Sequence, residues 1–135
     1  MVVSDEFPIS YNLTGISVVE NKTFGGKNLL LEEVNLFFAE VNKVIRLRPL
    51  GDTDEIEITQ QTVTNVSTGA PYWGKTFIGK QLQAIWVCDN NQGYQDMVIF
   101  GFDWLRPSLT FISEVSMLVV MGHNETVKRT GLPTK

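Results

Sequence analysis

The chain has 135 residues, of which 43% are hydrophobic, and a formal net charge of −4 at pH 7. This length suits one domain with its own hydrophobic core, and the single cysteine, Cys88, excludes an internal disulfide. One cysteine and one histidine also exclude a zinc site built from such residues within one chain, and the acidic balance argues against non-specific nucleic-acid binding, which needs a basic field.

Short alternating or apolar runs separated by turn residues predict β-structure over most of the chain. Residues 1–10 are expected to form a polar N-terminal arm, residues 11–122 a single β-rich domain, and residues 123–135 a polar tail. The spacing of the turns favours an antiparallel β-sandwich or a jelly-roll-like barrel. Strands are predicted at 11–19, 44–48, 54–67, 80–87, 97–104, 109–113 and 115–121.

One segment departs from this pattern, because its apolar residues recur at helical spacing. The spacing predicts an amphipathic helix at 29–43, which Asn28 could cap. The alternative is two β-strands joined near Asn35. The apolar stripe, which we expect to pack in the core, consists of Leu30, Val34, Phe37, Phe38, Val41, Val44 and Ile45.

Residues 69–76, GAPYWGKT, match the phosphate-binding loop pattern G-x-x-x-x-G-K-[ST]. In such a loop Lys75 and Thr76 would contact the phosphates and the magnesium ion. Asp103, which follows an apolar run, would mimic the magnesium-binding carboxylate. The letters of the motif therefore raise nucleotide binding as a hypothesis.

The residues inside the motif do not suit that chemistry. Pro71 has no N–H to donate to a phosphate, and Tyr72 and Trp73 are bulky where the backbone should be bare. The preceding strand is polar, whereas the strand before a phosphate loop is normally buried and apolar. We expect a turn between strands here, and neither a nucleotide nor any other cofactor.

Large aromatic side chains in such a turn are typical of a binding surface. Tyr72 and Trp73, with Tyr94 in the turn at 89–93, are therefore the candidate contacts for a ligand or partner. The alternative for Trp73 is that it folds back over one end of the core. Trp86 and Trp104 alternate with polar residues inside predicted strands, so we expect both in the core.

Other candidate chemistry is weaker. Residues 88–96 resemble a calcium loop, but glycine and the final acid fall at the wrong positions, which favours a hairpin; a looser oxygen-ligand site stays open. The basic cluster of Lys43, Arg46 and Arg48 fits a solvated strand better than a nucleic-acid site. Asp103 either lies in apolar surroundings that would raise its pKa, or it points outward or bonds to Arg106. No catalytic residue or metal ligand is assigned.

The second half of the chain, from 50 to 122, resembles small β-rich structural proteins of tailed phages, such as capsid, decoration, neck or tail components. The resemblance lies in the general character of the sequence, which has short strands rich in Thr, Asn and Gln and a lone cysteine. It implies a non-enzymatic subunit that self-associates through sheet edges and terminal arms, in the virion or in the host cytoplasm during assembly. The alternatives are a carbohydrate- or ligand-binding module and nucleotide binding through 69–76. No signal peptide or membrane-spanning segment is expected.

Overall fold

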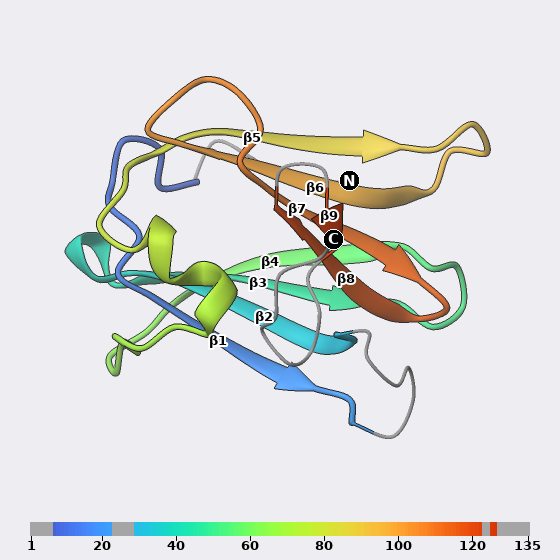
Figure 1. Ribbon diagram of the computed structural model, residues 1–135, viewed down its shortest axis with the longest axis horizontal. Helices are drawn as coiled ribbons and strands as arrows, with labels where there is room; N and C mark the ends of the chain where they lie inside the picture. The colour runs from blue at the N-terminus through green and yellow to red at the C-terminus, as the bar shows by residue number, and fades with distance from the viewer. Residues whose placement is uncertain (1–6, 23–28, 123–124, 127–135) are drawn as a thin grey trace.

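A computed structural model describes residues 7–22, 29–122 and 125–126. These residues form an antiparallel sheet that curls into a half-barrel (Figure 1), with two short 3-10 helices, η1 (Ala39–Val41) and η2 (Tyr72–Phe77). The sheet follows the order β4-β3-β2-β8-β7-β6-β5, while β1 pairs with β2 and β9 with β8. The strands are β1 (Gly15–Glu20), β2 (Leu31–Phe38), β3 (Lys43–Pro49), β4 (Ile56–Thr62), β5 (Leu82–Asp89), β6 (Gln95–Phe102), β7 (Leu109–Glu114), β8 (Met117–Gly122) and β9 (Glu125–Thr126).

The two halves of the sheet join at β2, which pairs with β1 and also divides its pairing between β3 and β8. Its residues 34–38 pair with β3, whereas Leu31 pairs with Leu118 of β8. Beyond this junction β5 to β8 continue as a second half of the sheet. Gln95 then ties the two halves together at one end, since its N–H donates to Glu55 Oε2 at 3.1 Å and its Nε2 donates to the Ile56 carbonyl at 2.8 Å.

The core fills the concave face of the half-barrel. Strand alternation places every second side chain there, as in β7, where Leu109 and Phe111 are buried and their neighbours are only partly so. Phe100 and Phe111 meet edge to face with ring centroids 6.0 Å apart. Trp73 of η2 packs against Phe111 at the same centroid distance, so η2 covers part of the core.

The mainly antiparallel β-structure is confirmed, whereas a sandwich or jelly roll is not. The helix expected at 29–43 is wrong: this segment forms β2, η1 and the first residue of β3. The alternative of two strands is correct in kind, but the chain reverses at η1 and Asn42, which has a φ of 53°, and not near Asn35. The proposed cap, Asn28, lies outside the described residues.

The false helical pattern arose because β2 and β3 bury side chains on both faces. Leu36 and Phe38 point into the core, whereas Phe37 lies on the outer face of the sheet, where it pairs with Val44 of β3. A strand in which apolar residues on the two faces follow one another, as at 36–38 and 44–45, loses its period of two there. Two such strands in succession produced an apolar spacing close to that of a helix.

The ends of the chain are described only in part. Of the expected N-terminal arm, Phe7 packs against the core and the Ser10 N–H donates to the Leu82 carbonyl at 2.7 Å. Of the expected tail, only residues 125 and 126 are described, and His123 lies outside the described residues. Within the described part of the chain, no helix has the length and apolarity that crossing a membrane requires.

Candidate functional site

The most exposed pair of large apolar side chains lies in the loop between β6 and β7. Trp104 is 68% exposed and its neighbour Leu105 is 75% exposed. The expectation that Trp104 lies in the core is therefore wrong, because β6 ends at Phe102 and the chain turns at Asp103, which has a φ of 67°. Adjacent exposed apolar residues of this size are typical of an interaction surface.

The β6–β7 loop is held tightly against the end of β6. A Cβ atom on Gly101 would lie 2.9 Å from the carbonyl oxygens of both Trp104 and Arg106, so the loop can fold back only over a glycine. The Phe102 N–H donates to Ser108 Oγ at 2.8 Å, which fixes the far side of the loop. The loop thus presents Trp104 from a rigid support.

A hollow of about 210 Å³ lies beside this loop, between it and η2. Phe77 and Phe102 supply an apolar side, with ring centroids 5.4 Å apart. Lys80 and Arg106 bring positive charge to it. The lining consists of Thr76, Phe77, Lys80, Phe102, Trp104, Arg106, Pro107 and Ser108. The hollow therefore combines aromatic surface with two cations.

Asp103 positions the loop and has no nucleophile or base beside it among the contacts described. Its N–H donates to the Gln81 carbonyl at 2.7 Å, and its Oδ1 accepts the Gln81 N–H at 3.1 Å. Its Oδ2 lies 3.9 Å from Lys80 Nζ. The carboxylate pairs with Lys80 and not with Arg106, and it links the β6–β7 loop to the start of β5.

The stretch that matches a phosphate loop lacks the frame that such a loop needs. It forms the six-residue 3-10 helix η2 after an extended Pro71 and leads into an antiparallel strand, whereas the motif requires a strand, a loop and an α-helix. The Gly74 N–H already donates to the Pro71 carbonyl at 2.9 Å. Lys75 and Thr76 are exposed, and only Thr76 lines the hollow.

The three aromatic candidates do not form one surface. Tyr72 is 45% exposed beside Trp73, which packs against the core as the alternative interpretation held. Tyr94 is 39% exposed in the β5–β6 turn, at the opposite end of the strands (Figure 1). Trp104 and Leu105 were not expected on the surface, although the turn signal at Arg106-Pro107 directly after them could have indicated a loop.

The expected hairpin at 88–96 is present. Asn90 Oδ1 accepts the N–H groups of Gln92 at 2.8 Å and Tyr94 at 3.2 Å, and Gly93 has a φ of 88°. The side chain that could have served as a calcium ligand thus organises the turn. Among the residues that the structure describes, no group of three or more His, Cys, Asp or Glu side chains could hold a metal ion.

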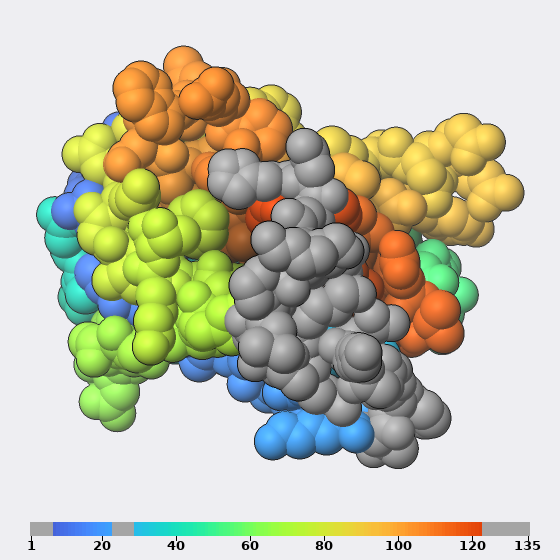
Figure 2. Space-filling view, in the orientation of Figure 1, coloured from blue at the N-terminus to red at the C-terminus, as the bar shows by residue number. Residues whose placement is uncertain are grey.

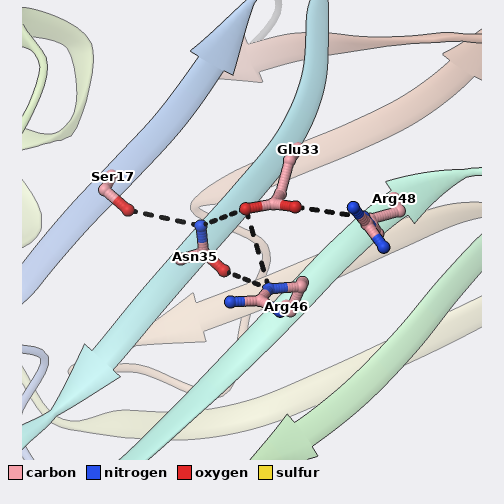
Figure 3. A network of polar contacts seen from close by, with 5 residues as sticks. All are labelled: Ser17, Glu33, Asn35, Arg46 and Arg48. Carbon is pink, nitrogen blue, oxygen red and sulfur yellow. Dashed lines mark hydrogen bonds and ion pairs between the residues drawn. The ribbon is translucent and has the colours of Figure 1, made fainter. Parts of the chain in front are cut away.

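Two residues of the basic cluster on β3, Arg46 and Arg48, belong to a network on the outer face of the sheet (Figure 3). Arg48 Nε lies 3.0 Å from Glu33 Oε1, and Arg46 Nε donates to Asn35 Oδ1 at 2.7 Å. Asn35, only 5% exposed, donates in turn to Glu33 at 2.9 Å and to Ser17 Oγ at 3.3 Å. Each charge in the network has a partner, so the network fixes the register of β1, β2 and β3.

Comparison with known proteins identifies a family, but not its function. No curated protein and no solved structure matched the chain. A family model described as a family of unknown function, DUF6334, matches residues 3–126. Since the match spans most of the chain, the protein belongs to the family DUF6334.

Proposed function

We propose that this protein acts by contact, as a non-enzymatic structural subunit that associates with copies of itself. The observation that supports this proposal is the rigid β6–β7 loop, with Trp104 at 68% and Leu105 at 75% exposure. Apolar side chains that are exposed to solvent do not stabilise the fold of the isolated chain. At protein interfaces, however, tryptophan is among the residues that contribute most to the binding free energy. Sheet edges can add to such an interface by pairing with another chain.

A capsid or tail component of a virion is the most specific form of this proposal. It is supported by the resemblance of residues 50–122 to small β-rich structural proteins of tailed phages. The chain termini would then contribute arms that contact a neighbouring subunit, beyond residues 7–10 and 125–126, which already pair or pack within the chain. Other structural subunits would be the remaining partners.

Light scattering over a series of protein concentrations tests self-association directly. We expect the mean mass to rise with concentration, and Trp104→Ser to weaken the association constant by at least about tenfold. Val19→Ser is a matched control, because Val19 is 46% exposed but lies on β1, away from the loop. A mass that stays monomeric at every concentration, with no assembly partner, would refute the proposal.

The hollow beside the loop supports a second candidate, a binding module for a carbohydrate or another small ligand. Its volume of about 210 Å³ is below that of drug-sized sites, roughly 300–1,000 Å³, so the ligand would be a single small group. Trp104 offers a face for stacking a sugar ring, while Lys80 and Arg106 would favour an anionic substituent.

Tryptophan fluorescence titrations with neutral and anionic sugars separate this candidate from the first. Binding in the hollow should change the emission of Trp104, and Arg106→Ala should abolish the response to anionic sugars while leaving the response to neutral sugars. An emission spectrum that no sugar alters would count against the candidate. Nucleotide binding through 69–76 is not proposed, since η2 lacks the frame of a phosphate loop.

A further inference from the structure

The strands of the half-barrel run lengthwise, so their connections gather at two opposite ends (Figure 1). We call one the turn end; it comprises the β3–β4, β5–β6 and β7–β8 turns at residues 50–55, 90–94 and 115–116. We call the other the loop end; it comprises η1, η2 and the β6–β7 loop. The eight residues of β6 separate the two ends by about 25 Å at the usual rise of a strand.

Among the described residues, the two ends carry opposite charge. The acids at or beside the turn end include Asp52, Asp54, Glu55, Glu57, Asp89, Asp96 and Glu114. Of the cations on that side, Lys22 follows β1, and Arg48 is paired with Glu33 at 3.0 Å. The loop end has the reverse balance, with Lys43, Lys75, Lys80 and Arg106 against Glu40 and Asp103.

Each end also has exposed apolar side chains among its charges. Val115 is 86% exposed at the turn end, with Leu50 at 40% and Tyr94 at 39%. At the loop end Trp104 and Leu105 are more than two thirds exposed. Figure 2 shows the β5–β6 hairpin in yellow projecting at one end and the β6–β7 loop in orange projecting at the other.

Hydrogen bonds hold the turns of the turn end together. Asp54 Oδ1 accepts the Ser116 N–H at 2.6 Å, which joins the β3–β4 turn to the β7–β8 turn. Glu55 Oε2 accepts the Gln95 N–H at 3.1 Å, which joins the same turn to the β5–β6 hairpin. Three turns distant in sequence therefore form one preformed surface, so ordering it on binding costs little entropy.

We infer that copies of this chain associate head to tail, the turn end of one copy docking on the loop end of the next. Interfaces combine apolar contacts with polar and charged surroundings, and here the charges at the two ends are of opposite sign. Two turn ends would repel each other, as would two loop ends. Because the complementary surfaces lie at opposite ends of one molecule, both can be occupied at once, which generates a ring or an open filament. This inference rests on the proposed self-association and specifies its geometry.

Two variants of the full chain test the geometry by sedimentation velocity. The first, Asp52→Lys with Glu114→Lys, reverses two exposed acids on separate turns of the turn end. The second, Lys75→Glu with Arg106→Glu, reverses two exposed cations of the loop end. Each variant alone should weaken association roughly two- to thirtyfold, the effect of two exposed charge pairs. An equimolar mixture should associate again, since each reversed end then meets a complementary one.

The controls separate this inference from the proposal beneath it. Thr59→Lys adds positive charge in the middle of β4, on its outer face, and should leave association unchanged. Raising the salt to about 1 M, where the Debye length falls to about 3 Å, should weaken association of the unaltered protein. If that protein associates but either variant alone associates equally well, head-to-tail docking is wrong while self-association stands. If the unaltered protein does not associate at all, both fall.

Discussion

Replacing Val115 by asparagine should stabilise the fold although it removes a hydrophobic side chain. Val115 and Ser116 occupy the tip of the β7–β8 hairpin with φ of 51° and 63°, the positive values that a two-residue hairpin turn requires. A left-handed conformation costs an ordinary L-residue about 1–2 kcal/mol, and a β-branched side chain tolerates it worst. Asparagine adopts it far more readily.

The structure indicates that little offsets this gain. Val115 is 86% exposed, so its replacement forfeits almost no buried apolar surface, and the hydrogen bonds between Ser116 and Asp54 stay in place. We expect the free energy of unfolding to rise by about 1 kcal/mol and the melting temperature by about 3–5 °C for a chain of this size. The exposed valine would also leave the turn end, so association should weaken.

Urea unfolding followed by far-ultraviolet circular dichroism measures the first effect, and sedimentation velocity measures the second. Val19→Asn is the matched control, since Val19 is also exposed, at 46%, but lies within β1. There the same substitution should cost up to about 1 kcal/mol, because asparagine is a poor strand residue. A neutral or destabilising result for Val115→Asn would refute the strain that we assign to this turn.

Other substitutions test the remaining parts of the structure. Asn35→Ala should cost about 1–3 kcal/mol of stability, because it leaves half-buried polar partners unpaired. Arg48→Ala should cost less than about 1 kcal/mol, because that side chain is 56% exposed. Urea unfolding measures both costs, and equal values would contradict the network. Trp73→Ala should lower the free energy of unfolding by about 2–3 kcal/mol. Trp104→Ala should change the free energy of unfolding by no more than about 0.5 kcal/mol. Gly15→Ala should destabilise by several kcal/mol, of the order seen for severe steric conflicts, since its Cβ would overlap the backbone oxygen of Ser67 in the β4–η2 loop. Wild-type stability would show that this loop moves freely.

Much of the β-structure could be predicted because its causes are local. The hairpin at 88–96 follows from Asn90 and Gly93, whose preferences act within a few residues. The rejection of the phosphate loop rested on Pro71 and its bulky neighbours, and the structure places Tyr72 and Trp73 in η2, a 3-10 helix that follows the extended Pro71. Both conclusions concern residues that are close in sequence.

Two predictions were wrong for the same reason: the sequence of one strand does not show which of its side chains the rest of the fold buries. The helix expected at 29–43 failed because Phe37, an apolar residue on the outer face of β2, stands between Leu36 and Phe38 of the core face, and its position between β1 and β3 accounts for this. Trp104 was expected in the core because it alternates with polar neighbours. Its exposure is decided by the end of β6 at Phe102 and by the close packing of the loop on Gly101.

The sequence by itself determined the β class, most of the turns and the number of charges of each sign, because steric preference and side-chain chemistry belong to each residue and its neighbours. The tertiary structure alone decided where those charges gather. Asp52, Asp89 and Glu114 lie far apart in the chain, yet antiparallel strands of similar length return the chain to the same end each time. The same pairing brings Lys80 and Arg106 together at the other end, and so gives the molecule two ends of opposite charge.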